Sequence, residues 1–132
     1  MSAIQIFIVE DEGLIAEHLK LSLEKLGYEV LGMAAKYSEA VAFLESNQPD
    51  LIIADIMLAG EKDGIDLGEY VRKHYHLPFI FLTSHSDKST VNRAKTVKPN
   101  GYLVTPYGRS DLYVAIETAI STFQGGDEES AA

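Results

Sequence analysis

The sequence predicts an α/β protein with a five-stranded parallel sheet that is covered by helices on both faces. Short apolar runs, which fit buried strands, alternate along the chain with stretches whose apolar residues recur at helical spacing. Several of the apolar runs end directly on an acidic or hydroxyl side chain, as residues 51–54 do at Asp55. Because strands that are apolar on both faces need cover on both sides, the alternation favours a doubly wound sheet.

The first strand is expected over residues 4–9, an apolar run that stops at Glu10 and Asp11. The next stretch carries leucine and isoleucine at helical spacing and predicts the first helix. Gly27 is well suited to end this helix, because glycine readily adopts the left-handed conformation found there. Residues 28–33 form the second apolar run and predict the second strand.

The middle of the chain repeats this pattern. Ser38 is expected to cap an amphipathic second helix, and residues 51–55 form the third strand. A third helix is expected from Gly64 to about residue 75, and the fourth strand covers residues 79–83. That strand again finishes on a polar group, the hydroxyl of Thr83.

The last two helices differ in the amount of apolar surface that they carry. Asp87 is expected to cap a fourth helix that ends near Val97, and its thin apolar stripe predicts weak anchoring. Residues 101–105 form the fifth strand, and Ser110 is expected to cap a fifth helix with a full apolar face. Five such pairs at this chain length fit the flavodoxin-like strand order 2-1-3-4-5.

The composition indicates one domain and limits the kinds of partner. The 132 residues are expected to form a domain over residues 1–124 and a disordered acidic tail over residues 125–132. The net charge of −9 disfavours binding to nucleic acid or to an anionic membrane surface. No cysteine, targeting segment or membrane-spanning run is visible in the sequence, so we expect a cytoplasmic protein.

Acidic side chains are expected to meet at one edge of this sheet. Glu10 and Asp11 follow the first strand and Asp55 ends the third, and these strands flank the point where the strand order reverses. Three converging carboxylates repel one another unless a cation neutralises them, and oxygen ligands without histidine or cysteine favour Mg²⁺. The alternatives are an acidic pocket without a metal and an Asp55 that only caps the following loop.

A metal beside a carboxylate, with hydroxyls nearby, is suited to phosphoryl transfer. In this interpretation Asp55 is the nucleophile, and the hydroxyls of Thr83 and Thr105 lie at neighbouring strand ends. Thr83 would donate its hydroxyl to a phosphoryl oxygen. The alternative for Thr83 is a strand-end residue whose hydroxyl bonds to the backbone.

Four motifs resemble those of the receiver domain of bacterial two-component response regulators, a resemblance that covers residues 4 to about 123. They are Val9-Glu10-Asp11-Glu12, the run from Pro49 to Asp55, Thr83-Ser84, and the run from Gly101 to Pro106. The resemblance implies that Glu10, Asp11, Asp55 and the Met57 carbonyl bind Mg²⁺. It also implies that Asp55 takes a phosphoryl group from a histidine kinase or a histidine phosphotransfer protein.

The resemblance further implies a switch rather than an enzyme, with chemistry limited to phosphorylation and dephosphorylation of Asp55. Thr83 and Tyr102 would form this switch, although Tyr102 also fits a half-buried strand aromatic. The affected surface would comprise the fourth helix, the fifth strand and the fifth helix. Its partner would be an unknown output protein or a second copy of the chain.

The chain departs from the family pattern at Thr105, where the family has a lysine before the proline. We therefore expect slower phosphorylation, weaker switching or a constitutive state, and the alternative function is a pseudo-receiver that binds partners constitutively. Lys62 lies in a longer loop after Asp55 and either approaches the phosphoryl group or, as the favoured alternative, is a solvated surface lysine. Lys98 precedes the fifth strand and is not expected to reach the site. His85 is expected at the rim of the site.

A different class, a haloacid-dehalogenase-type phosphatase, also begins with a strand-end aspartate. It is disfavoured because Asp55-Ile56-Met57 lacks the second aspartate two residues on.

Overall fold

The strands form one parallel sheet in the order β2-β1-β3-β4-β5. The computed structural model describes residues 3–84 and 88–131, and it describes only the backbone of residues 124–131. The strands are β1 (Gln5–Val9), β2 (Glu29–Ala34), β3 (Leu51–Asp55), β4 (Phe79–Thr83) and β5 (Gly101–Val104). The helices are α1 (Gly13–Lys25), α2 (Tyr37–Ser46), α3 (Gly64–His74), α4 (Lys88–Thr96) and α5 (Arg109–Ala131). The predicted fold class and strand order are confirmed.

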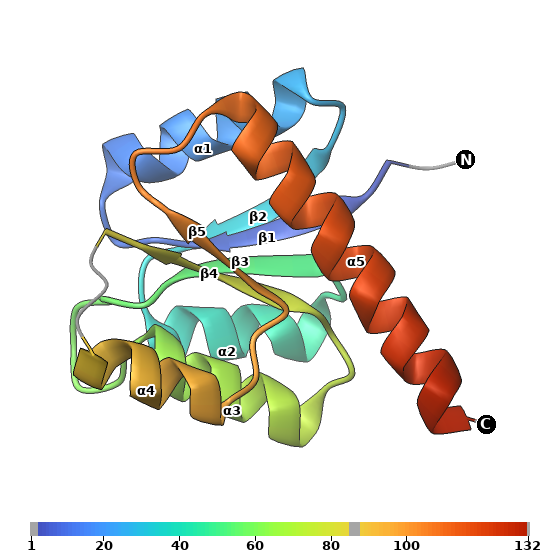
Figure 1. Ribbon diagram of the computed structural model, residues 1–132. Coiled ribbons are helices and arrows are strands. Elements are labelled where there is room, and N and C mark those ends of the chain that lie inside the picture. Colours follow the sequence, from blue (N-terminus) through green and yellow to red (C-terminus); the bar gives the residue numbers. More distant parts are fainter. Residues whose placement is uncertain (1–2, 85–87, 132) are drawn as a thin grey trace.

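The sheet lies between two layers of helices, with α1 and α5 on one face and α2, α3 and α4 on the other (Figure 1). Alternate residues of the central strands feed two separate apolar clusters, one under each layer. Every residue from Leu51 to Ala54 is buried, as is every residue of β4. The polar side chains at the ends of these two strands are therefore attached to buried strands.

The register of the strands brings distant polar residues to one edge. Val9 of β1 pairs with Ala54 of β3, so Glu10 is level with Asp55. Asp55 in turn pairs with Leu82 of β4, which places Thr83 one residue further on. The C-terminal end of α5 lies at the opposite edge, where the strands begin (Figure 1).

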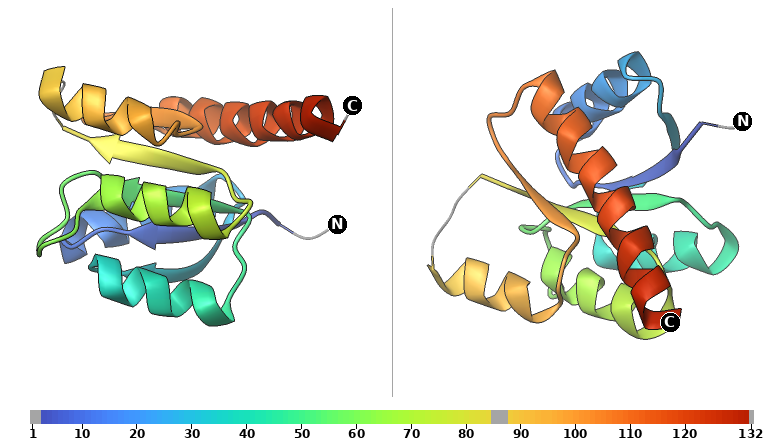
Figure 2. Two further views of the ribbon diagram at one scale, coloured as in Figure 1. Left: turned by 90° about the horizontal axis from the view of Figure 1, so that it is seen from below. Right: turned by 45° about the vertical axis from the view of Figure 1, so that its right-hand side comes forward.

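The helix at the β5 side is thinly packed, as the sequence predicts. Of its nine residues, α4 buries Ala94, with Val97 buried directly after the helix. Only Leu103 of β5 is fully buried. The strand lies between α4 and α5 (Figure 2), and Tyr102 and Val104 are 40% and 53% exposed on it.

Several helix ends differ from the sequence prediction. Gly27 follows α1 with φ of +93°, as expected. Ser38 does not cap α2, which begins one residue earlier, at Tyr37. Ser110 lies inside α5, where Asp111 accepts a hydrogen bond from the backbone N–H of Gly108 (2.7 Å). A serine caps a helix only if it is the last residue before the helical backbone begins. The sequence does not define this boundary to a single residue.

Two further expectations concern parts of the chain that the structure describes incompletely. Asp87, the expected cap of α4, lies outside the described residues. The backbone of residues 125–131 continues α5 in the structure, where the sequence predicts a disordered tail. The domain boundary at residue 124 stays a prediction. None of the helices in the described part of the chain combines the length and the hydrophobicity that a membrane crossing requires.

Candidate metal centre

Three carboxylates converge where β1 and β3 end. Glu10, Asp11 and Asp55 each offer an oxygen, and these oxygens all lie within 4.8 Å of one another. Glu10 is buried, Asp55 is partly buried and Asp11 is exposed, so the cluster opens from the sheet towards solvent. The structure thus brings together the three acidic side chains that the sequence assigns to one site.

Backbone N–H groups of the surrounding loops fix the orientation of these carboxylates. Asp55 Oδ1 accepts from the N–H of Met57 (2.9 Å), and Glu10 Oε2 accepts from the N–H of Glu12 (3.1 Å). Asp11 Oδ2 accepts from the N–H of Ala59 (3.2 Å), which ties the loop after β3 to the end of β1. The cluster is therefore preorganised by the loops rather than by cationic side chains.

Burial and mutual repulsion disturb the proton affinity of this cluster. Burial is the main cause that raises the pKa of Glu10 to about 8, and the negative charge of Asp55 adds to the effect. The pKa of Asp55 is also raised, again chiefly by burial, with a contribution from the charge of Asp11. Without a cation, the cluster thus keeps a proton near neutral pH.

The residues fit a magnesium ion by donor type and by spacing. Oxygens that share one octahedral Mg²⁺ lie about 3–4 Å apart, because each is about 2.1 Å from the ion. The three carboxylate oxygens all lie within 4.8 Å of one another, and a donor set of carboxylate oxygens is of the type that Mg²⁺ prefers. A divalent cation would replace the proton and relieve the repulsion.

The first turn of α3 packs directly against the backbone of Asp55. The N–H of Gly64 donates to the carbonyl of Ile56 (2.9 Å), and a Cβ atom added at Gly64 would overlap the carbonyl oxygen of Asp55. Only glycine allows this approach, because a backbone oxygen cannot rotate away as a side chain does. Asp63 caps the same turn, a role that the sequence analysis missed.

The predicted hydroxyl and aromatic residues lie on or directly after the two strands that follow β3 in the sheet. Thr83 is buried at the end of β4, and its carbonyl accepts from the N–H of Thr105 (2.9 Å). Thr105 is partly buried after β5. The ring of Tyr102 lies 6.3 Å from the ring of Phe81 and is partly exposed.

Neither lysine considered in the sequence lies in a position that replaces a lysine at residue 105. The ammonium of Lys62 lies over the ring of Tyr37, 4.8 Å from its centre. Lys98 lies before β5, at the end of the strand opposite Thr105, as expected. His85 lies outside the described residues.

The remaining histidines take no part in the carboxylate cluster. His18 is exposed on α1, and His74 and His76 pack against the rings of Tyr70 and Phe123 (4.5 Å each). These positions agree with the surface and packing roles expected for histidines outside a metal site.

One aromatic neighbour of the cluster was not expected. Tyr107 is half-buried after β5, and its pKa is raised by burial and, to a lesser extent, by the charge of Glu10. The sequence did not indicate that Tyr107 lies near Glu10. A tyrosine two residues after Thr105 is equally well explained as a residue that packs against the core.

Comparison with known proteins agrees with this geometry. The family model of the response regulator receiver domain matches residues 6–117. Over 120 residues the chain is 38% identical to the transcriptional regulatory protein PdtaR of Mycobacterium tuberculosis. Over 119 residues it is 34% identical to the phyllosphere-induced regulator PhyR of Methylorubrum extorquens. These matches cover 91% and 89% of this chain but 58% and 44% of the relatives, so it spans about half of their length.

Solved structures show the same fold. The signal receiver domain of a modulated diguanylate cyclase from Desulfovibrio desulfuricans G20 has a TM-score of 0.87 at 40% identity, covering 93% of this chain and 98% of that one. The signal receiver domain of a signal transduction histidine kinase from Syntrophus aciditrophicus has a TM-score of 0.82 at 33% identity, covering 91% and 92%.

Proposed function

This chain belongs to the response regulator receiver domain family, and we propose that it acts as a phosphoacceptor module with Asp55 as the acceptor. The observation that carries the proposal is the convergence of Glu10, Asp11 and Asp55 at one edge of the sheet. The donor would be the phosphohistidine of a histidine kinase or of a histidine phosphotransfer protein. We include the cytoplasmic location expected from the sequence in this proposal.

In the proposed reaction, a carboxylate oxygen of Asp55 attacks the phosphorus atom of the phosphohistidine. A P–O bond forms to Asp55 while the P–N bond breaks, and the released histidine nitrogen recovers its electron pair. Glu10, Asp11, Asp55 and the Met57 carbonyl would hold Mg²⁺. The ion, when bound, neutralises charge on the transferred group. The N–H of Met57 orients Asp55 for the attack.

The switch that follows would use the hydroxyl of Thr83 and the ring of Tyr102. Thr83 is buried beside the third-strand end, so a small movement of its hydroxyl would reach a phosphoryl group on Asp55. The partly exposed Tyr102 lies on β5 between α4 and α5. We propose that this face, α4–β5–α5, contacts an output protein or a second copy of the chain.

A pseudo-receiver is the second candidate, and Thr105 is the observation that favours it. A lysine at this position would give a charge-assisted hydrogen bond, worth about 1.5–3 kcal/mol. Thr105 offers only a neutral hydroxyl, and Lys62 lies over the Tyr37 ring rather than at the cluster. In this case the chain would bind its partners without phosphorylation.

Intact mass spectrometry tests the choice. The protein is incubated with Mg²⁺ and acetyl phosphate, beside Asp55→Asn and a metal-free sample. We expect a single phosphoryl adduct that requires the metal and is absent from Asp55→Asn. An adduct that persists in Asp55→Asn would contradict the assignment of the acceptor, and no adduct in any sample would favour the pseudo-receiver.

Thr105→Lys then tests the effect of the missing charge. We expect this variant to be phosphorylated faster than the native chain, because the ammonium would stabilise the transferred group. Equal rates in the two proteins would show that Thr105 does not limit the reaction.

Sustained turnover distinguishes a switch from a phosphatase. We expect that phosphate is released only by hydrolysis of phosphorylated Asp55. The native chain should not hydrolyse p-nitrophenyl phosphate over several hours. Steady hydrolysis of that ester by the native chain, abolished in Asp55→Asn, would instead support an aspartyl-phosphate enzyme.

A further inference from the structure

The C-terminal end of α4 is anchored by a partly buried arginine of α3. Arg72 donates hydrogen bonds to the carbonyls of Val97 (3.2 Å) and Lys98, and to the side chain of Asn100 (2.9 Å). Its guanidinium also lies over the ring of Phe79, 4.5 Å from the centre. These contacts tie the turn after α4 to both α3 and β4, so this end of the helix is held by several interactions at once.

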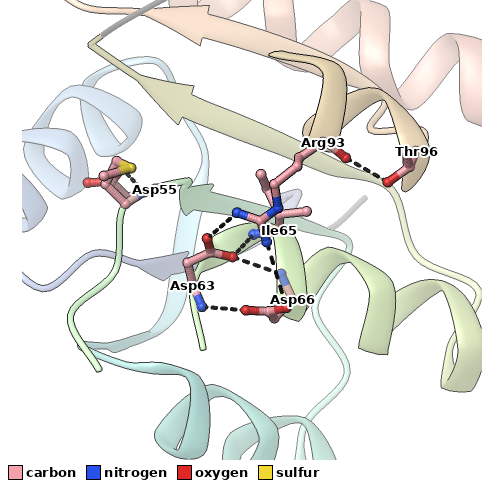
Figure 3. A network of polar contacts seen from close by, with 7 residues as sticks. Asp55, Asp63, Ile65, Asp66, Arg93 and Thr96 are labelled. Carbon is pink, nitrogen blue, oxygen red and sulfur yellow. Dashed lines mark hydrogen bonds and ion pairs between the residues drawn. The ribbon is translucent and has the colours of Figure 1, made fainter. Parts of the chain in front are cut away.

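The middle of α4 is held in a different way, by an ion pair near the surface. Arg93 donates to Asp63 Oδ2 (2.9 Å) and lies 3.9 Å from Asp66 Oδ1. Figure 3 shows Arg93 reaching from α4 to these two aspartates at the start of α3. The side chains of Arg93 and Asp63 are 55% and 23% exposed, and ion pairs of this kind are weak. Ala94 is the buried residue of the helix, and Thr90 and Val91 are partly buried.

Asp63 connects this ion pair to the carboxylate cluster. Its Oδ1 caps the first turn of α3 while its Oδ2 accepts from Arg93. Burial disfavours the charge, but the hydrogen bond from Arg93 lowers the pKa of Asp63 and keeps it ionised. The next residue, Gly64, packs on the backbone carbonyl of Asp55. A continuous series of contacts therefore runs from Asp55 through Gly64 and Asp63 to α4.

We propose that the ion pair between Arg93 and Asp63 is a releasable latch on α4. The Arg72 contacts fix the C-terminal end of the helix, and the latch holds its middle against the start of α3. Opening of the latch releases the middle of α4 from the start of α3 while the C-terminal end stays in place. Because Asp63 precedes the glycine that packs on Asp55, occupation of Asp55 alters the latch. This last step rests on the proposed phosphorylation.

Hydrogen exchange of the unphosphorylated protein, followed by mass spectrometry, tests the latch itself. We expect Arg93→Gln to raise exchange over residues 88–94 by about 2–5-fold, the effect of one weak ion pair. Asp63→Asn should do the same to a lesser degree, since asparagine still caps the helix and Asp66 remains. The double variant should add little to Arg93→Gln. Lys95→Gln, which removes an exposed charge of the same helix, is the control.

The location of the change separates a latch from general destabilisation. Arg93→Lys should restore most of the protection, and exchange over residues 97–103 should match that of the native chain. Equal exchange over residues 88–94 in the native chain and in Arg93→Gln would overturn the latch. Increases that spread over residues 97–103, or that Lys95→Gln reproduces, would also overturn it.

A second comparison tests the connection to Asp55. The native chain and Arg93→Gln are each measured with Mg²⁺ and acetyl phosphate. We expect the change in α4 exchange on phosphorylation to be at least about twofold smaller in Arg93→Gln, because its latch is already open. Equal changes would overturn the connection. If the native chain takes no phosphoryl group, the proposed function fails, and the measurement without phosphodonor still decides the latch.

Discussion

The two sides of the sheet's carboxyl edge are held together in opposite ways. At β1 and β3, the acidic cluster stands on strands whose side chains are buried on both faces. At β5 and α4, the fully buried residues are Leu103 and Ala94, and polar contacts such as the Arg93–Asp63 ion pair add to the attachment. Reacting side chains must be held in fixed positions. A protein surface can change only if one of its elements moves with a small cost in free energy. The difference fits the proposed function, in which the first side carries the chemistry and the second changes its surface.

The strongest test of this difference compares core residues of two helices on the same face. Leu67 of α3 is 1% exposed, and Leu67→Ala should lower the free energy of unfolding by about 2–4 kcal/mol. Val91 of α4 is only partly buried, and Val91→Ala should cost less than about 1 kcal/mol. Urea unfolding followed by circular dichroism measures both. Similar losses in the two variants would mean that α4 is packed as firmly as α3.

Gly64 and Gly13 allow a matched comparison of two glycines that each begin a helix. Gly64→Ala should destabilise the fold by about 1–3 kcal/mol and slow uptake of phosphate, because the new methyl group displaces the backbone of Asp55. Gly13 has open space around it, so Gly13→Ala should change stability by less than about 0.5 kcal/mol. Unfolding curves and the phosphorylation assay together would reveal whether Gly64 matters as proposed. A Gly64→Ala protein with native stability and native uptake would refute the close contact.

The acidic side is well packed but electrostatically unfavourable, which predicts an unusual dependence on pH. Burial raises the pKa of Glu10 from 4.5 to about 8, so between these values the folded state binds more protons than the unfolded state. The resulting stabilisation is complete below pH 4.5 and is lost as pH rises through 8. Without metal, we expect unfolding at pH 9 to require about 1–2 kcal/mol less than at pH 6.

Thermal unfolding from pH 6 to pH 9 measures this loss. Mg²⁺ should restore stability most strongly at the upper end of the range, and Glu10→Gln should flatten the curve. A metal-free protein whose stability rises over this range would contradict a proton shared within the cluster.

The smallest expected effect is on the loosely held side, at the turn after α4. Lys98 adopts φ of +50°, a conformation that costs side-chain-bearing residues free energy. Lys98→Gly should therefore stabilise the protein by about 0.5–1 kcal/mol, although glycine also loses more entropy on folding. Arg72 donates to the backbone carbonyl of Lys98, and this contact does not depend on the lysine side chain. Chemical denaturation of the native chain and of Lys98→Gly measures the difference in stability. A destabilised variant would show that the lysine side chain contributes more than its conformation costs.

The sequence predicted what depends on local patterns and failed where contacts join distant elements. Apolar runs and helical spacing were sufficient for the strand order, and the strand ends located Glu10, Asp11 and Asp55. The bond between Arg93 and Asp63 was not predictable, because 30 positions separate them and charged surface residues have many possible partners. The position of Lys62 over Tyr37 was missed for the same reason.

The helix caps show a second limit. The start of α3 at Gly64 was predicted correctly, but the role of Asp63 as its cap was not recognised, although its side chain is of the type expected there. Ser38 and Ser110 have equally suitable side chains and do not cap their helices. Residue type alone therefore does not reveal which of several neighbouring polar residues lies at the turn of the backbone.

The start of β1 and the C-terminal end of α5 lie at the edge of the sheet where the strands begin, away from the carboxylates (Figure 1). A fluorophore, an affinity tag or a solid support joined at either end would therefore leave the acidic edge facing solution. The molecule can be tethered for single-molecule or surface-plasmon measurements without obstructing an approaching phosphodonor.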